Sequence, residues 1–171
     1  MAMPINDKIK QSLQAAEGLY HRLVLLVGET GSGKTGVLRD VAEEFGTSVI
    51  NVNLALSGEL LELTAKQRAL QLPGIFNQIV RNSLSPVVLD NLEIIFDKGL
   101  QQDPLRLLQG LSRNQTVVAS WNGRYSGGRL FYAETGHSEY RSYESIDALI
   151  VGMDGTATVD STEKYTEAGQ A

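Results

Sequence analysis

The sequence predicts an α/β protein in three layers, with a mainly parallel five-stranded sheet between two layers of helices. Short apolar runs suited to buried strands alternate with longer segments whose apolar residues recur at helical spacing. A glycine-rich segment also joins the first run directly to a helical segment. Strands that alternate with helices form parallel sheets covered on both faces. The five strand segments are residues 23–27, 48–53, 87–89, 116–120 and 148–151.

Helices are predicted on both sides of the first strand. Apolar residues four apart in 5–13 follow Pro4, which suits the start of a helix. Residues 34–45 form the next helix, and Gly46 ends it.

The rest of the chain is less regular. Leucines after Ser57 predict one helix, Pro73 starts another, and a helical region surrounds Pro104. Residues 123–143 are irregular and rich in glycine and tyrosine, with 129–133 as a candidate extra strand.

Length and composition predict one domain over residues 1–153 and a flexible polar tail over 154–171. The chain has no cysteine, which excludes disulfides and fits a reducing compartment. Neither a membrane span nor a signal peptide is predicted, so we expect a cytoplasmic protein. With 15 basic and 20 acidic residues and no basic run, the sequence does not favour autonomous nucleic-acid binding and leaves direct DNA binding open.

The glycine-rich segment matches the pattern of a phosphate-binding loop, Gly-x₄-Gly-Lys-Thr, in its proper strand–loop–helix context. Glycines let backbone N–H groups wrap closely around a phosphate, and the start of the helix adds further donors. Lys34 can reach the β- and γ-phosphates, and the Thr35 hydroxyl can bind Mg²⁺. The predicted nucleotide-binding residues are Gly28, Glu29, Thr30, Gly31, Ser32, Gly33, Lys34, Thr35 and Gly36.

An overlapping pattern, Gly31-x-Gly33-x-x-Gly36, fits the dinucleotide-binding fingerprint. That fingerprint needs an acidic residue at the end of the second strand, where this chain has asparagine. It also leaves Lys34 and Thr35 without a role, so we reject it.

The strand at 87–89 ends in Asp90, which is the Walker B pattern of a nucleotide site. An aspartate at this position can hold Mg²⁺ together with Thr35, usually through a water. The alternative is a turn or helix cap that leads into Asn91.

Two further residues are expected to act on the attacking water and the γ-phosphate. Many P-loop ATPases carry a glutamate directly after the Walker B aspartate, and this chain carries Asn91 there. We expect Glu93 to act as the base if the chain turns helical, the alternative being a solvated carboxylate. We expect Asn122 to sense the γ-phosphate, with Ser120 as the second choice and a turn signal as the alternative.

An arginine can stabilise the charge of the transferring phosphoryl group. Arg124 and Arg129 follow the fourth strand, where a neighbouring subunit could meet them, and Arg113 and Arg141 are further candidates. Trp121 is expected to pack rather than to take part in chemistry.

The whole chain resembles the F component of type-3 BREX bacteriophage-exclusion systems, a small P-loop protein, over roughly residues 5–153. Besides the strand–loop–helix opening, the segments that carry the resemblance are 60–68, 89–96, 120–123 and 132–141. The resemblance implies a RecA/AAA-like ATPase core in the bacterial cytoplasm, working beside a larger ATPase, a methyltransferase and other defence proteins.

The sequence thus favours an ATP-binding, Mg²⁺-dependent ATPase subunit of a defence complex, with Lys34, Glu93 and Asn122 as catalytic residues. A non-hydrolysing nucleotide-dependent adaptor, motivated by Asn91, and a small-substrate phosphotransferase remain alternatives. No helical lid is predicted after the fifth strand, so we expect another subunit, in a homo-oligomer or a complex, to complete the site. Activity per chain should then rise with concentration or with a partner.

Overall fold

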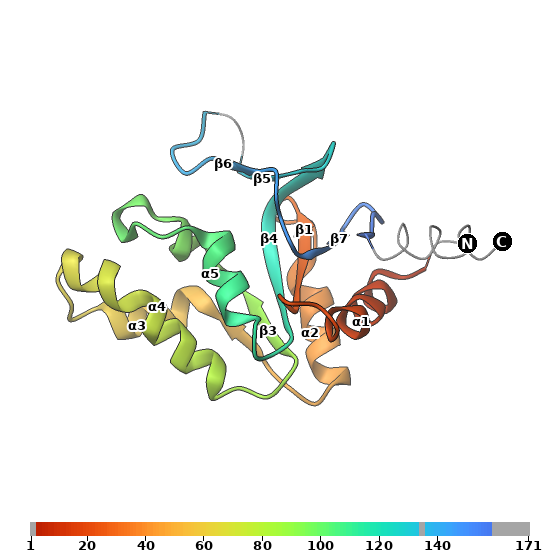
Figure 1. Ribbon diagram of the computed structural model, residues 1–171, viewed down its shortest axis with the longest axis horizontal. Coiled ribbons are helices and arrows are strands. Elements are labelled where there is room, and N and C mark those ends of the chain that lie inside the picture. Colours follow the sequence, from red (N-terminus) through yellow and green to blue (C-terminus); the bar gives the residue numbers. More distant parts are fainter. Residues whose placement is uncertain (1–2, 134–135, 159–171) are drawn as a thin grey trace.

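Figure 1 presents the computed structural model, which describes residues 3–133 and 136–158. Five parallel strands form the centre of the sheet in the order β2-β3-β4-β1-β7. Their bounds are Leu23–Gly28 for β1, Val49–Asn51 for β2, Val87–Asp90 for β3, Val117–Ser126 for β4 and Leu149–Gly152 for β7. The predicted fold class is confirmed, and β4 lies between the strand before the phosphate loop and the Walker B strand.

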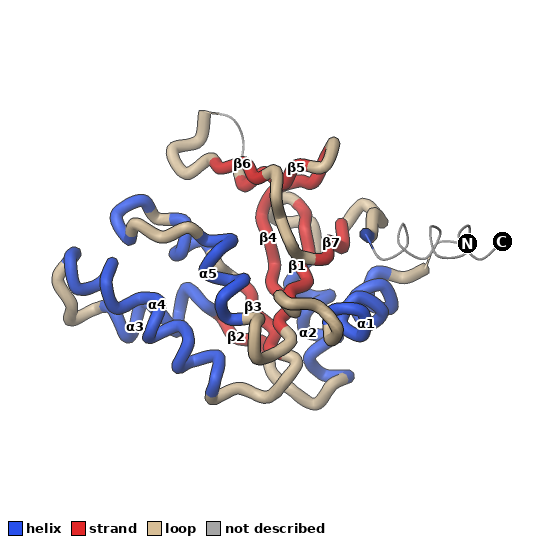
Figure 2. Tube along the Cα trace, viewed as in Figure 1, coloured by secondary structure: helices blue, strands red, loops and turns tan. Residues whose placement is uncertain are grey.

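Helices cover both faces of this sheet (Figures 1 and 2). α1 (Ile5–Ala16) and α2 (Lys34–Glu44) pack on one face. The other face is covered by α3 (Val52–Leu60), α4 (Ala65–Arg81) and α5 (Pro104–Leu111). Along β1, Val24 and Leu26 face the first layer, whereas Leu23, Leu25 and Val27 face the second. Burial on both faces explains why this strand is a continuous apolar run.

The second strand is shorter than the predicted 48–53, because a helix begins within that segment. β2 ends at Asn51, whose side chain accepts a hydrogen bond from the Leu54 backbone N–H at 3.0 Å and caps α3 (Val52–Leu60). The strand therefore ends two residues early, and Asn53 lies in the first turn of a helix above the sheet edge.

The predicted helix boundaries between 57 and 81 are also wrong. Thr64 and Gln67 form a capping box that starts α4 (Ala65–Arg81), and this helix continues through Pro73. Proline cannot bond the carbonyl four residues before it. Here that carbonyl, of Ala69, accepts a hydrogen bond from Gln102 Nε2 at 2.8 Å, so the helix persists.

The predicted helical region around Pro104 is present as α5 (Pro104–Leu111), whose cap residue is Asp103. Between β3 and α5 the chain forms two 3₁₀ turns, η1 (Glu93–Phe96) and η2 (Lys98–Leu100). The helical turn that we expected at Glu93 is therefore a 3₁₀ turn.

The irregular segment after the fourth strand folds into an antiparallel extension of the sheet. β4 continues to Ser126 and pairs with β5 (Arg129–Tyr132), which pairs in turn with β6 (Arg141–Tyr143). Gly127 and Gly128 both have positive φ in the two-residue turn, as type I′ hairpins require. The expected extra strand at 129–133 is confirmed, whereas the sequence did not predict β6.

An aromatic cluster fixes this extension to the core. Trp121 is buried, donates from Nε1 to the Phe131 carbonyl at 3.0 Å, and contacts Phe96, Tyr132 and Tyr143 edge to face. Phe96 stacks on Tyr132 with ring centroids 3.4 Å apart. Trp121 therefore packs, as expected, and holds the hairpin in place.

The segment predicted as a tail begins with residues that hydrogen-bond to the sheet. The Gly152 backbone N–H donates to the Thr156 carbonyl at 2.6 Å, and the Ile150 N–H donates to Thr158 Oγ1 at 3.0 Å. The rest of that segment, residues 159–171, lies outside the described residues. Among the described helices, none is long and apolar enough to cross a membrane.

Candidate nucleotide site

The phosphate-loop pattern folds as a tight turn between β1 and α2. Gly31 and Gly33 have φ of +82° and +97°, which other residues rarely adopt, and α2 begins directly at Lys34. A Cβ on Gly28 would lie 2.6 Å from Ser32 Oγ and 2.7 Å from Met153 Cγ. The glycines are thus required by the close path of the loop, and the helix N-terminus faces the same space.

The Lys34 ammonium lies inside this loop. Nζ donates to the carbonyls of Gly28 at 2.7 Å and Glu29 at 2.8 Å, and lies 3.4 Å from Ser32 Oγ. Burial lowers the pKa of Lys34, and the charges of Asp90, Glu93 and Glu29 act in the opposite direction. A buried ammonium beside backbone donors gives the end of β1 the chemistry that suits an anion.

Asp90 is held by two hydroxyl groups. Thr35 Oγ1 donates to Asp90 Oδ2 at 2.7 Å, and Ser120 Oγ donates to Asp90 Oδ1 at 2.7 Å. Asp90 is only 5% exposed, so these donors satisfy a carboxylate that water barely reaches. The structure thus brings Thr35 and Asp90 together and places Ser120 on Asp90.

The oxygen donors of Thr35 and Asp90 fit Mg²⁺, which prefers hard oxygen ligands and usually binds one or two carboxylates with substrate phosphates. No group of three or more metal-binding His, Cys, Asp or Glu residues occurs in the described part of the chain. A divalent ion here would consequently depend on the phosphates of the nucleotide for further ligands.

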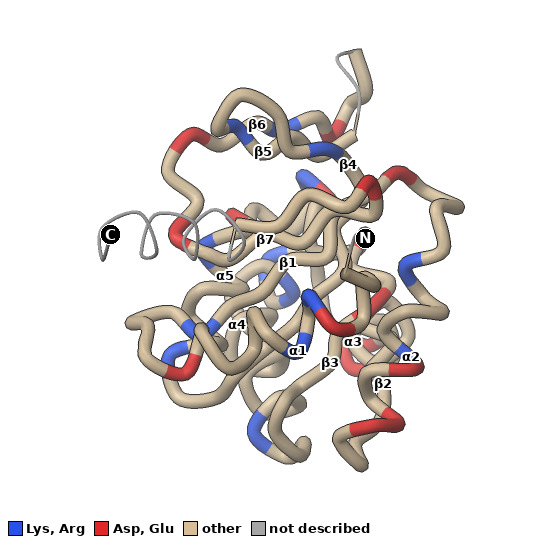
Figure 3. Tube along the Cα trace, turned by 90° about the vertical axis from the view of Figure 1, so that its right-hand side faces the viewer, with Lys and Arg blue, Asp and Glu red and all other residues tan. Residues whose placement is uncertain are grey.

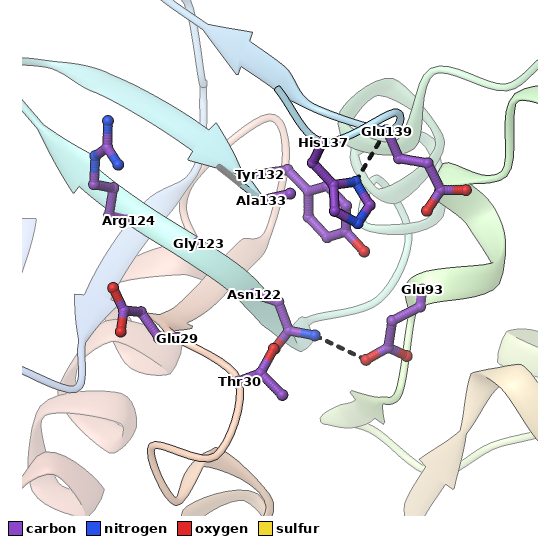
Figure 4. Close-up of a pocket in the computed structure, with 10 residues that line it drawn as sticks. All are labelled: Glu29, Thr30, Glu93, Asn122, Gly123, Arg124, Tyr132, Ala133, His137 and Glu139. Atoms are coloured by element: carbon purple, nitrogen blue, oxygen red, sulfur yellow. Dashed lines mark hydrogen bonds between the residues drawn. The ribbon is translucent and has the colours of Figure 1, made fainter. Parts of the chain in front are cut away.

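Glu93 is held between two amide side chains, of which Figure 4 shows that of Asn122. Asn122 Nδ2 donates to Glu93 Oε1 at 2.8 Å, and Asn53 Nδ2 donates to Glu93 Oε2 at 2.6 Å. The 3₁₀ turn that begins at Glu93 brings its carboxylate back over the ends of β3 and β4. The two residues expected to act on water, Glu93 and Asn122, are therefore in direct contact.

Asn53 is a site residue that the sequence reasoning missed. Its Oδ1 accepts from the Ile94 backbone N–H at 2.8 Å, and its own N–H donates to the Asn91 carbonyl at 2.8 Å. Asn91 itself has φ of +55° and contributes this carbonyl to the site framework. The signal was available, because polar residues at the carboxyl ends of parallel strands gather at one sheet edge.

A pocket of about 750 Å³ opens beside these groups, a volume typical of small-ligand sites (Figure 4). The phosphate loop forms one wall, Glu93 and Asn122 form the floor, and the antiparallel extension forms the far wall. Its lining residues are Glu29, Thr30, Glu93, Asn122, Gly123, Arg124, Tyr132, Ala133, His137 and Glu139.

The candidate arginines differ in position. Arg124 lines the pocket, whereas Arg129 forms an ion pair with Glu144, and Arg141 donates to the Gln102 carbonyl at 3.0 Å. Arg113 lies over the Tyr20 ring, 4.2 Å from its centroid. Figure 3 shows basic and acidic positions interspersed along the described chain rather than gathered in one basic stripe on the face in view.

The strand order, the phosphate loop and the Walker B carboxylate together define a P-loop NTPase. The sequence model of the ATPase family associated with various cellular activities (AAA) matches residues 24–120, which is more than half of the chain. The protein belongs to the AAA family. The matched range contains the phosphate loop, Asp90 and Glu93, and it ends before Asn122 and the antiparallel extension.

No curated protein and no solved structure significantly matches the chain. The family assignment therefore rests on the family match, and it agrees with the fold.

Proposed function

We propose that this AAA-family protein binds ATP with Mg²⁺ and hydrolyses it at the edge of the sheet formed by β1, β3 and β4. The contact between Glu93 and Asn122 beside the phosphate loop carries the proposal, because it fixes a carboxylate at the floor of the pocket, where it could accept a proton from an attacking water. The phosphate loop and Lys34 would hold the triphosphate, and Thr35 and Asp90 would hold Mg²⁺, which neutralises phosphate charge when bound.

In this reaction Glu93 takes a proton from water, the water oxygen bonds to the γ-phosphorus, and the bond from that phosphorus to the bridging oxygen breaks, releasing ADP. The donors on both oxygens of Glu93 fix the direction of its remaining lone pairs. Asn122 then serves two functions, since it orients Glu93 and lies beside the loop that holds the γ-phosphate.

We further propose that the protein acts in the bacterial cytoplasm as a subunit of a BREX-type defence complex, either as a homo-oligomer or beside other defence proteins. The support is the position of the segments that resemble the BREX component. Residues 89–96 carry Asp90 and Glu93, 120–123 carry Ser120 and Asn122, and 132–141 contribute to the pocket wall. Three of the four segments that carry the resemblance outside the phosphate loop therefore contribute residues to the site.

The test of the biochemical proposal is phosphate release and nucleotide binding by the wild type and by Lys34→Ala, measured with ATP and GTP. We expect ATP turnover by the wild type and loss of both binding and turnover in the variant. ATP binding without phosphate release at any protein concentration would contradict hydrolysis and support the adaptor. A product formed only with an added acceptor would support the phosphotransferase.

The test of the cellular proposal is phage plating on cells that carry the complete defence system with wild-type protein or Lys34→Ala. We expect the variant to lose protection while its abundance stays equal. Full protection by an equally abundant variant would contradict a role of nucleotide binding in defence.

A further inference from the structure

Side chains at alternate positions of β4 follow one face of the sheet from the core to the nucleotide site. Val118 lies in the core layer beneath α1 and α2, Ser120 binds Asp90, and Asn122 binds Glu93. Residues two apart in a strand point to the same face, about 7 Å apart along it. The next position on this face is Arg124, since β4 runs without interruption to Ser126.

The register places Arg124 beside the phosphate loop of its own chain. Asn122 pairs with Gly28, the last residue of β1, so Arg124 extends β4 two residues past the point where the loop begins. Arg124 and Glu29 together line both the large pocket and a smaller one of about 310 Å³ (Figure 4).

The Arg124 side chain is exposed and only weakly held. Its guanidinium lies over the Phe131 ring, 4.5 Å from the centroid, and it forms no ion pair with the described acidic residues. An exposed contact of this kind is weak, and exposed side chains change rotamer within nanoseconds. Arg129, on the same hairpin, is instead engaged with Glu144.

The backbone beneath Arg124 is fixed. Trp121 bonds the Phe131 carbonyl, the Ala133 N–H donates to the Asn122 carbonyl at 3.2 Å, and Gly123 permits a pairing with β5 too close for a Cβ. A charged group on a rigid strand beside the reacting phosphate suits electrostatic catalysis.

We propose that Arg124 is a catalytic residue that acts on the γ-phosphoryl group bound by its own chain. This inference rests on the proposed ATPase function. The guanidinium leaves Phe131, donates to γ-phosphate oxygens, and stabilises the charge that develops as the bond to the bridging oxygen breaks. A neighbouring subunit then need not supply this charge, so turnover per chain stays constant on dilution, contrary to the expectation from sequence.

The test compares phosphate release by the wild type, Arg124→Ala and the matched control Arg129→Ala. We expect Arg124→Ala to lower kcat by roughly 10³-fold, the lower end for arginines on transferring phosphoryl groups. Its ATP Kd should stay within about threefold of the wild type, because the interaction forms in the transition state. Arg129→Ala should keep wild-type kcat, and added guanidinium chloride at low concentration should partly restore Arg124→Ala.

Mixing Arg124→Ala with Lys34→Ala separates action within one chain from action between chains. We expect no recovery, because the chain that binds ATP still lacks its own arginine. Recovery on mixing would overturn the proposal in favour of a neighbour's arginine, and wild-type kcat in Arg124→Ala would overturn it outright.

Phe131→Leu distinguishes catalysis from a structural role in the hairpin. This variant removes the contact with the ring and keeps the guanidinium, so we expect kcat within about threefold of the wild type. A loss equal to that of Arg124→Ala would assign Arg124 a structural role and overturn the proposal. A wild type that binds ATP without phosphate release at any concentration would instead overturn the ATPase function itself.

Discussion

Asn53, in the first turn of α3, bonds to Glu93 and Ile94 of η1, so Asn53→Ala tests how the Glu93 carboxylate is held in place. The substitution removes one hydrogen bond to a carboxylate and one from the Ile94 backbone N–H. Bonds to charged groups contribute about 1.5 to 3 kcal/mol and neutral ones about 0.5 to 1.5 kcal/mol. We therefore expect the free energy of unfolding to fall by about 2 to 4.5 kcal/mol.

A domain with ordinary stability, about 5 to 15 kcal/mol, remains folded after such a loss. Glu93 keeps its bond to Asn122 and loses the other, so its carboxylate is less well oriented toward water. We expect kcat to fall roughly 10- to 100-fold, the effect of a small misplacement of a reacting group. ATP affinity should change little, because Asn53 has no contact with the phosphate loop in the described structure.

The assays are urea unfolding and steady-state phosphate release, with Leu54→Ala as the control. Leu54 is the next residue on α3 and is 73% exposed, so its truncation should leave both quantities near those of the wild type. Wild-type kcat in a folded Asn53→Ala protein would refute the idea that Glu93 must be held by both amides.

Three further substitutions test the surroundings of the site. Ser120→Ala removes a donor to the buried Asp90 carboxylate, so the free energy of unfolding should fall by about 1.5 to 3 kcal/mol. The control Ser126→Ala, on the exposed end of β4, should change it little. Equal effects of the two substitutions in urea unfolding would contradict this expectation. Gly123→Ala would place a Cβ 1.8 Å from the Phe131 carbonyl oxygen, so the β4–β5 pairing should break and the Tm should fall. The control is Gly58→Ala in α3, where a Cβ meets nothing within 4 Å, and it should keep or raise the Tm. Hydrogen bonds from the backbone N–H and the hydroxyl of Thr156 hold the pKa of Asp154 in the folded protein below its ordinary value of 3.8. The ionised carboxylate therefore stabilises the folded protein above pH 3.8, and this stabilisation is lost as the pH falls through the folded-state pKa. The difference in urea midpoint between the wild type and Asp154→Ala should therefore shrink from pH 7 to pH 3, and a constant difference would rule out this linkage.

Local patterns sufficed to predict the strand, loop and helix that bind phosphate. Glycine spacing, an apolar run and a helical repeat lie within about 20 residues here, so no distant contact is needed to specify them. The same holds for Asp90 at the end of its strand. The sequence also indicated Glu93 and Asn122 as residues of the site, and their direct contact, which was not predicted, agrees with the rule that the ends of parallel strands meet at one edge.

Distant contacts decided what the sequence could not predict. The passage of α4 through Pro73 depends on Gln102, which satisfies the Ala69 carbonyl from another part of the chain. β6 is three residues long, and it forms a strand because its backbone pairs with the free edge of β5. The rule for strand ends could have placed Asn53 near the site, but its bond to Glu93, 40 positions away, depends on the start of α3 and the 3₁₀ turn, which the sequence did not predict.

The most direct test of the central claim is ATP binding and phosphate release by the wild type and Glu93→Gln. Glutamine keeps the shape of the side chain and loses the basic carboxylate, and Asn53 and Asn122 remain in place to hold it. We predict that Glu93→Gln binds ATP within about threefold of the wild-type affinity and loses nearly all turnover, as removal of a general base requires. Wild-type turnover in Glu93→Gln would contradict the account.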